Sequence, residues 1–133
     1  MPLGNVLVVE DDETIRRLLV EYLKEQSLIV DGARDGVEAL HRISSKPYSV
    51  IVLDVMMPHM SGIDLLDSLQ ALSSDPSLET RIAPPAVLVV TSISPQELPS
   101  HDLETRFPSI VRDVLRKPVD ACALMKRVEA LLH

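Results

Sequence analysis

The stretch YSVIVLDVMMP, residues 48–58, places an acidic side chain, Asp54, where an apolar run ends and a turn begins. A buried strand accommodates Val and Ile readily, but an ionised carboxylate in the same place needs a counter-charge or a metal ion. A second apolar run, Val6–Val9, also ends on acidic residues, Glu10-Asp11-Asp12, and a lysine, Lys117, ends a third. The ends of these runs are therefore where we look for a site.

Apolar segments of two kinds alternate along the 133-residue chain, which has the length of one domain. Short continuous apolar runs predict buried strands, and apolar residues at helical spacing predict amphipathic helices. Their alternation implies an α/β fold, with a parallel sheet and helices on both of its faces. We expect strands at residues 6–9, 28–30, 50–53, 86–90 and 113–116, and helices at 15–23, 35–43, 63–72 and 120–132.

The segment from residue 73 to residue 118 is less regular than the rest of the chain. Seven of the ten prolines lie between Pro76 and Pro118, and no glycine follows Gly62. Ser94-Pro95 begins like a capped helix with proline at its first position. Pro99 would interrupt that helix, because proline removes a backbone donor and crowds the preceding turn. We therefore expect an irregular fourth helix that is short or shifted.

Polar residues follow four of the predicted strands, and this placement predicts a binding site. In open parallel sheets, ligands bind outside the carboxyl ends of the strands, at the point where the strand order reverses. Carboxylates suit a divalent cation such as Mg²⁺, and a lysine suits a phosphoryl group. The residues at these ends are Glu10, Asp11, Asp54, Thr91 and Lys117.

Composition argues against several classes of partner. The net charge of −7 disfavours binding along a nucleic-acid backbone, which requires a basic surface. The three aromatic residues, Tyr22, Tyr48 and Phe107, are too few for a base-stacking platform. We find neither a signal peptide nor an apolar stretch near the roughly 20 residues of a membrane span. We expect a cytoplasmic protein without direct nucleic-acid or membrane contact.

The other reactive side chains do not indicate a second site. Cys122 is the single cysteine and cannot form an intramolecular disulfide. Its spacing to Leu124 and Met125 predicts a core residue rather than a nucleophile. The histidines share no spacing typical of metal ligands, so we interpret them as surface residues: His41, His59, His101 and His133.

Five motifs together resemble the receiver domain of two-component response regulators, over nearly the whole chain. Each is weak alone, because a strand and a turn would explain it, but five in this order at strand ends are specific. The resemblance implies one receiver domain over residues 1–133, with a flavodoxin-like, doubly wound sheet of five parallel strands in the order 2-1-3-4-5. The motifs are LVVEDD (7–12), ARDGVEAL (33–40), LDVMMP (53–58) with Gly62, Thr91-Ser92 and Lys117-Pro118.

The resemblance implies that Asp54 accepts a phosphoryl group from the phosphohistidine of a sensor histidine kinase or phosphotransfer protein. Lys117 would pair with Asp54 before transfer and with the phosphoryl oxygens afterwards. Its bond to Pro118 resembles the family's cis peptide. The Thr91 hydroxyl would move to hydrogen-bond the new phosphoryl group, and this movement would carry the signal to a distant surface. The chain would thus be a regulatory domain rather than a metabolic enzyme, acting on an unknown downstream protein or effector domain.

Mg²⁺ is the cofactor that the resemblance implies. Asp11 and Asp54 would be its direct carboxylate ligands, because Mg²⁺ prefers a few carboxylates together with water. The backbone carbonyl of Met56 would fill another position, and Glu10 would act through a water molecule.

Three positions depart from the family pattern. The residue three before the lysine is usually aromatic and moves with the threonine, but here it is Val114. The residues two after Asp54 and two after Thr91 are Met56 and Ile93. Polar residues there help to orient the hydrolytic water in the family, and apolar ones do not. We therefore expect slow self-dephosphorylation, and an output surface that cannot be inferred from the family.

Two other functions are possible for the same residues. A phosphatase with an aspartyl nucleophile would need a second acid two residues after Asp54, where Met56 stands. A pseudo-receiver scaffold would have lost its site, whereas Asp11, Asp54, Thr91 and Lys117 are all present. Taken singly, each of these residues also has a simpler explanation: a helix end for Asp11, a turn for Asp54, a β-forming residue for Thr91 and a surface side chain for Lys117.

Overall fold

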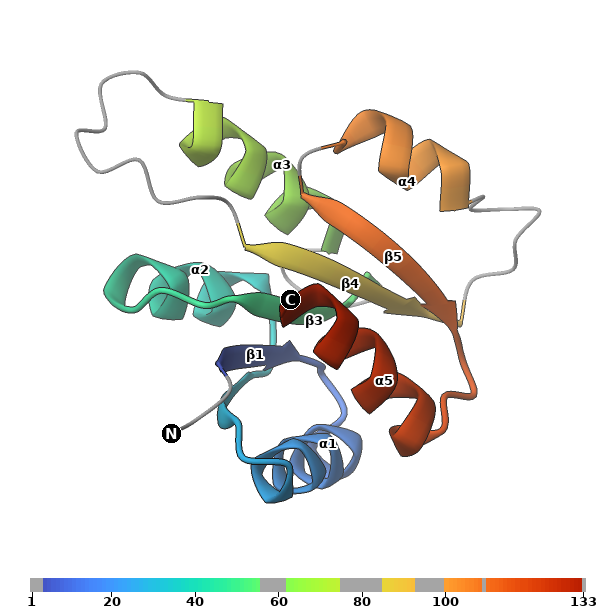
Figure 1. Ribbon diagram of the computed structural model, residues 1–133. Helices are drawn as coiled ribbons and strands as arrows, with labels where there is room; N and C mark the ends of the chain where they lie inside the picture. The colour runs from blue at the N-terminus through green and yellow to red at the C-terminus, as the bar shows by residue number, and fades with distance from the viewer. Residues whose placement is uncertain (1–3, 56–61, 75–84, 93–99, 109, 133) are drawn as a thin grey trace.

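The computed structural model describes residues 4–55, 62–74, 85–92, 100–108 and 110–132 (Figure 1). Within them, strands alternate with helices along the chain, as the sequence predicts. The elements are β1 (Asn5–Val9), α1 (Glu13–Glu25), β2 (Ile29–Ala33), α2 (Gly36–Ser45), β3 (Val50–Asp54), α3 (Gly62–Ser74), β4 (Ala86–Thr91), α4 (Ser100–Arg106), β5 (Val111–Arg116) and α5 (Ala121–Leu132).

The strands form one five-stranded sheet in the order β2-β1-β3-β4-β5, and all neighbours are parallel. This confirms the predicted topology. α1 and α5 cover one face of the sheet, and α2, α3 and α4 cover the other (Figure 1). β2 and β3 lie on opposite sides of β1, so the strand order reverses between β1 and β3. The carboxyl ends of these two strands therefore form the expected binding edge.

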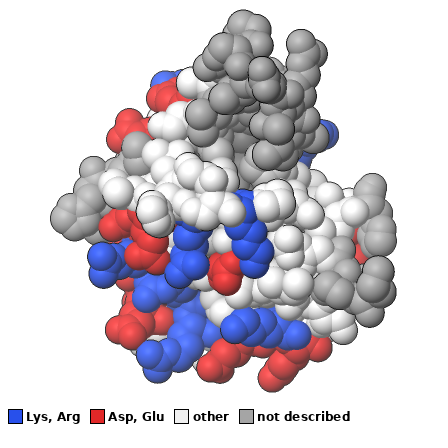
Figure 2. All heavy atoms as spheres, turned by 90° about the vertical axis from the view of Figure 1, so that its left-hand side faces the viewer, with Lys and Arg blue, Asp and Glu red and all other residues white. Residues whose placement is uncertain are grey.

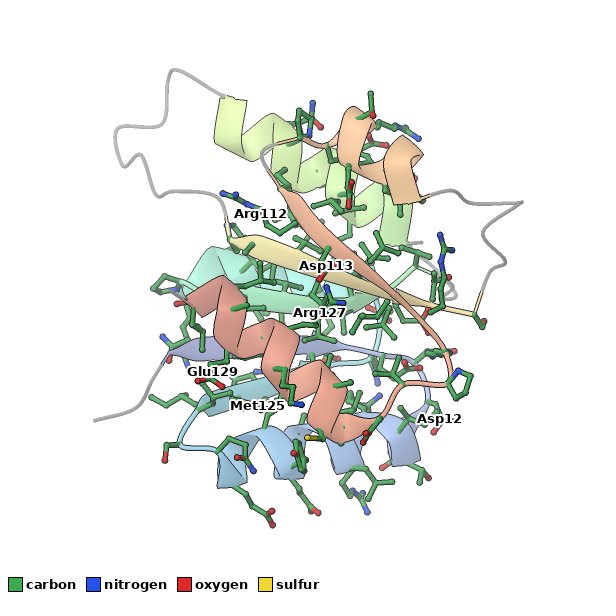
Figure 3. The ribbon with its side chains drawn as sticks, turned by 45° about the vertical axis from the view of Figure 1, so that its right-hand side comes forward. Asp12, Arg112, Asp113, Met125, Arg127 and Glu129 are labelled. Atoms are coloured by element: carbon green, nitrogen blue, oxygen red, sulfur yellow. The ribbon has the colours of Figure 1, made fainter. Side chains whose placement is uncertain are left out.

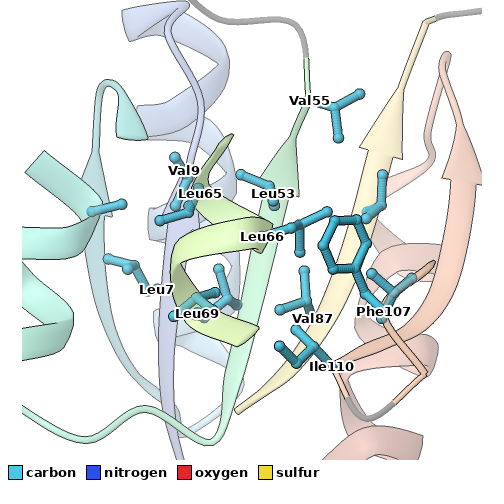
Figure 4. Close-up of a cluster of buried hydrophobic side chains, with 14 of the residues drawn as sticks. Leu7, Val9, Leu53, Val55, Leu65, Leu66, Leu69, Val87, Phe107 and Ile110 are labelled. Carbon is cyan, nitrogen blue, oxygen red and sulfur yellow. The ribbon is translucent and has the colours of Figure 1, made fainter. Parts of the chain in front are cut away.

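β3 is the central strand, and its alternate residues face the two helical layers. Val50 and Val52 pack with residues of α1 and α5, whereas Ile51 and Leu53 pack with residues of α2 and α3. Figure 4 shows the second of these clusters, to which Phe107 contributes the largest fully buried side chain. Burial on both faces explains the continuous apolar run in the sequence. It also places the last residue of the strand inside the protein.

Several strands extend beyond the apolar runs that predict them. β2 occupies Ile29–Ala33 rather than residues 28–30, because its pairing with β1 continues past the apolar residues. β3 and β4 each include the polar residue that follows the run, Asp54 and Thr91. β5 begins at Val111. Strand ends depend on the backbone ladder, which hydrophobicity alone does not report.

α4 is short and shifted, as the prolines predict. It begins at Ser100, directly after Pro99, and ends at Arg106. The predicted start at Ser94-Pro95 lies outside the described residues. Proline fits the entry of a helix better than its interior, so the helix begins beyond Pro99.

The prediction that Cys122 packs in the core is wrong, because its side chain is exposed. A residue two positions before Leu124 lies about 200° around a helix from it, and therefore points away from the same partner. The core-facing side of α5 buries Leu124, Met125 and Val128.

Arg127 lies on the side of α5 next to β5, where its guanidinium donates to the Asp113 carboxylate at 2.5 Å (Figure 3).

Charges of both signs lie beside one another on the surface shown in Figure 2, rather than forming a patch of one sign. Ion pairs elsewhere among the described residues include Arg34 with Glu38 at 3.3 Å and Arg17 with Glu13 at 3.0 Å. Among the described residues, no helix has the length and hydropathy needed to cross a membrane.

A polar network fastens the edge strand β2 to the loop before β3. The Asp31 carboxylate accepts a hydrogen bond from the Tyr48 hydroxyl at 2.7 Å and one from Lys46 Nζ at 3.0 Å. Burial by itself would raise the pKa of Asp31, but these hydrogen bonds outweigh it and lower the pKa below its ordinary value of 3.8. Burial and the bond to Asp31 raise the pKa of Tyr48 to about 12.

We predict that Asp31→Asn lowers the free energy of unfolding by about 1–2 kcal/mol at pH 7. A carboxylate with a lowered folded-state pKa stabilises the protein above its unfolded pKa, and this stability is lost as the pH falls below that value. The difference between wild type and variant should therefore shrink below pH 3.8. Urea denaturation across this range measures it. Glu21→Gln, at an exposed carboxylate of α1, is the control. A difference that is independent of pH would contradict the prediction.

Candidate functional site

The sheet register brings the carboxyl ends of four strands together. Val9 of β1 lies opposite Leu53 of β3, so the next residues, Glu10 and Asp54, are neighbours across the two strands. The Lys117 backbone N–H, directly after β5, donates to the Thr91 carbonyl of β4 at 2.8 Å. Four of the five residues that the sequence analysis places at strand ends, Glu10, Asp54, Thr91 and Lys117, are thereby brought to one edge of the sheet.

Three carboxylates converge at this edge. One oxygen each from Glu10, Asp11 and Asp54 lies within 4.8 Å of the other two. Glu10 and Asp54 are buried, at 4% and 5% exposed, whereas Asp11 is exposed. Oxygen donors of this kind, open to water on one side, suit a hard divalent cation. The residues present therefore fit the metal that the sequence implies.

Lys117 is the counter-ion of the two buried carboxylates. Its Nζ lies 3.3 Å from Asp54 Oδ2, as the sequence analysis expects, and 3.1 Å from Glu10 Oε2. The contact with Glu10 is the shorter one, and the sequence did not indicate it. The peptide bond between Lys117 and Pro118 is cis, as expected.

Burial and neighbouring charged groups shift the pKa values of Glu10 and Lys117. Burial, together with the nearby charge of Asp54, raises the pKa of Glu10 from 4.5 to about 6, although Lys117 and the Asp12 backbone N–H work against this rise. Burial lowers the pKa of Lys117, but its hydrogen bond to Glu10 and the charge of Asp54 outweigh burial, and the net pKa is raised. The lysine therefore stays charged, and the cluster retains excess negative charge.

Gly62 is the first residue of α3 and lies against the backbone that carries Asp54. A Cβ at this position would approach the Val55 Cα to 2.4 Å and the Asp54 carbonyl oxygen to 3.0 Å. The Gly62 N–H also donates to the Val55 carbonyl at 3.2 Å. Only glycine permits this close approach of α3 to the end of β3.

The remaining predicted positions lie at different depths. Thr91 is fully buried at the end of β4. Val114 of β5 is partly buried and packs against the core cluster on the α2, α3 and α4 face. Met56 and Ile93 lie outside the described residues.

Two features of the site had no signal in the sequence. The Arg16 guanidinium of α1 donates from Nη1 to the Glu10 backbone carbonyl at 2.8 Å. An apolar cavity of about 480 Å³ adjoins Asp54 and Lys117 between α1 and α5, and its walls include Ile15, Leu19 and Val119. Both depend on how α1 packs on the sheet, and helical periodicity does not specify this packing.

Known sequences similar to this chain match it over nearly its whole length. The family model for the response regulator receiver domain matches residues 6–129. The chain is similar to the regulatory protein VanRB of Enterococcus faecalis, with 32% identity over 128 residues. This alignment covers 96% of the chain and 52% of VanRB. The chain thus spans about half the length of the curated relatives it matches.

Solved structures share the fold. The receiver domain of the Francisella response regulator 1452 has a TM-score of 0.77 and 31% identity, and the match covers 97% of this chain and 96% of that one. The response regulator TrrA of Thermotoga maritima, in complex with Mg²⁺-BeF, has a TM-score of 0.76 and 27% identity, with 98% and 99% covered.

We predict that Glu10 makes the metal-free protein less stable as the pH rises from 4.5 to about 6. Because its folded-state pKa is raised, the folded protein holds more protons than the unfolded chain in this window, so the free energy of unfolding falls as the pH rises. The fall is at most roughly 2 kcal/mol.

Glu10→Gln lacks the titrating carboxyl group. The free energy of unfolding of the variant, relative to that of wild type, should therefore rise across the same pH window. Urea denaturation in the presence of a chelator measures both proteins. Parallel curves for the two proteins across the window would contradict the prediction.

Proposed function

Because the chain belongs to the response regulator receiver domain family, we propose that Asp54 is its phosphoacceptor. The residue would take a phosphoryl group from the phosphohistidine of a sensor histidine kinase or a phosphotransfer protein. The observation that carries this proposal is the buried Asp54 carboxylate with Lys117 Nζ at 3.3 Å, beside two further carboxylates. A buried carboxylate at the switch point of the sheet, held by a lysine and open to a cation, is suited to phosphoryl transfer.

The transfer is a substitution at phosphorus. An Asp54 carboxylate oxygen attacks the phosphorus, the bond between phosphorus and the histidine nitrogen breaks, and the imidazole leaves with the electron pair. Lys117 holds Asp54 in place before the attack and can turn its Nζ to an oxygen of the transferred group afterwards. Its contact with Glu10, at 3.1 Å, keeps the ammonium group at the site during this exchange.

We propose that Asp11, Asp54 and the backbone carbonyl of Met56 hold Mg²⁺ directly. Glu10 would act through a water molecule, which agrees with its engagement by Lys117. When bound, the cation would neutralise charge on the phosphoryl oxygens. The complex of TrrA with Mg²⁺-BeF supports the choice of metal.

The signal would leave the site through Thr91. Its hydroxyl would bond the phosphoryl group, and β4 would transmit the change to β5 and α4, which pack together. Val114 stands where the family has an aromatic ring, so a change of ring position cannot carry the signal here. The packing of β4, β5 and α4 would carry it instead.

The chain is a domain of a regulatory family, and response regulators act between histidine kinases and downstream effectors. We propose that residues 1–133 form one receiver domain, that it acts in the cytoplasm, and that it contacts neither nucleic acid nor membrane directly. The phosphatase and scaffold alternatives are not favoured by the family match or by the acidic cluster.

We predict that the protein forms a labile phosphoryl adduct when incubated with Mg²⁺ and a small acyl phosphate. Intact-mass analysis should show one adduct on wild type and none on Asp54→Asn, because the amide lacks the nucleophilic oxygen. Asp64→Asn, at an exposed position of α3, is the matched control and should form the adduct.

Other outcomes of this experiment separate the alternatives. An adduct that persists in Asp54→Asn would show that another residue is the phosphoacceptor. Absence of any adduct would favour the scaffold. Repeated turnover of phosphomonoesters would favour the phosphatase.

We further predict slow self-dephosphorylation, because Met56 and Ile93 offer no polar group to orient water. Met56→Asn should shorten the lifetime of the adduct by roughly tenfold, below the ~10²–10⁴-fold that a positioned acid or base contributes. The decay of the adduct followed by mass measures this, with Met57→Asn as the control. A wild-type adduct that decays as fast as that of Met56→Asn would refute the prediction.

A further inference from the structure

Two adjacent arginines of α1 have different surroundings. Arg17 is exposed and pairs with Glu13 at 3.0 Å, one helical turn earlier. Arg16 is half-buried, and its Nη1 donates to the backbone carbonyl of Glu10 at 2.8 Å. Arg16 therefore reaches across the loop between β1 and α1 to the backbone of the site, whereas Arg17 stays on its own helix.

The Glu10 backbone is held on both sides. Its N–H donates to the Ala33 carbonyl of β2 at 3.0 Å, and its carbonyl accepts from Arg16. That carbonyl belongs to the planar peptide unit that joins Glu10 to Asp11. A change in the Glu10 ψ angle would turn this unit and displace Asp11, so the hydrogen bond from Arg16 restrains the position of Asp11 at the site.

Gly32 of β2 makes room for Arg16. A Cβ on Gly32 would lie 3.2 Å from Arg16 Cδ and 3.3 Å from Arg16 Cγ, which is tighter than ordinary contact. The aliphatic part of Arg16 therefore lies directly on the glycine. Gly32 has no positive φ, so the space above it, rather than its backbone conformation, is what a larger residue would disturb.

We propose that Arg16 is a positioning residue of the phosphorylation site, which orients the Glu10–Asp11 peptide so that Asp11 can bind the divalent cation. This inference rests on the proposed function, since it takes Asp11 as a metal ligand. Residues that orient metal ligands typically contribute 10–100-fold to metal affinity. Arg16 acts on the ligand through the backbone.

The positioning role and the charge of Arg16 have opposite effects on cation affinity. A guanidinium remains charged and repels a cation at the adjacent acidic cluster, so removal of its charge alone would strengthen Mg²⁺ binding. Loss of the hydrogen bond would weaken Mg²⁺ binding, because Asp11 would no longer be held in place. The sign of the change in affinity therefore separates the two effects.

The test is Mg²⁺ titration of the full chain by calorimetry. Arg16→Met keeps the aliphatic stem and removes the donors, and we expect its Mg²⁺ dissociation constant to rise about tenfold. Arg16→Lys, which keeps one donor group, should recover part of the affinity. Arg17→Met removes the same charge one residue away and should leave the dissociation constant unchanged or slightly lower.

A second readout needs no metal. In the metal-free protein, the ¹³C shift of the Glu10 carbonyl and the ¹⁵N shift of the Asp11 amide should change in Arg16→Met and stay as in wild type in Arg17→Met. These nuclei lie in the peptide unit that Arg16 holds. Circular dichroism shows whether each variant is folded.

Gly32→Val tests the same contact from the other side. It should displace the Arg16 stem and weaken Mg²⁺ binding. The double variant should bind Mg²⁺ about as weakly as Arg16→Met alone, because the two changes remove one interaction. Additive losses in the double variant would overturn this link.

The possible failures are distinguishable. If wild type binds Mg²⁺ and Arg16→Met binds it equally or more tightly, the positioning role is overturned while the proposed function stands. If wild type binds no Mg²⁺ at millimolar concentration, both the metal of the proposed function and this inference are overturned.

Discussion

The burial of two adjacent carboxylates against one lysine is the interaction on which the site depends. Glu10 and Asp54 are almost fully buried, and Lys117 lies within 3.3 Å of both. One ammonium group cannot neutralise two carboxylates, and Asp11 adds a third negative charge at the surface. Burial, together with the charge of Asp54, raises the pKa of Glu10. A divalent cation would relieve it, so the structure is suited to bind a metal before it receives an anionic phosphoryl group.

The parallel sheet imposes this arrangement, because it brings the ends of sequence-distant strands into one row. The pairing of Val9 with Leu53 sets Glu10 beside Asp54, and the backbone hydrogen bond at the ends of β5 and β4 sets Lys117 beside Thr91. Two glycines then permit close approaches that any side chain would hinder. Gly62 admits the start of α3 to the backbone at Asp54, and Gly32 admits the stem of Arg16. The geometry of the site thus depends on residues that carry no charge.

The side of the protein that would receive the signal is built differently from the site. Val114 is part of the packing around the core, and α4 is a helix of seven residues that begins after Pro99. Phe107, just after α4, is buried in the same cluster as β4 residues. A displacement of Thr91 would therefore alter the packing of β4 against its neighbours, because tightly packed cores transmit displacement.

The amino-acid sequence alone predicts the α/β class, the parallel sheet, the short fourth helix and the residues at the strand ends. It could do so because strand and helix periods differ, and because charged residues after apolar runs are informative. The three-dimensional structure was needed to show that Lys117 contacts Glu10 more closely than Asp54, and that Arg16 holds the Glu10 carbonyl. These features depend on the rotation of each helix about its axis and on side-chain reach across elements. A linear pattern shows which residues share a helix face, but not which atoms that face meets.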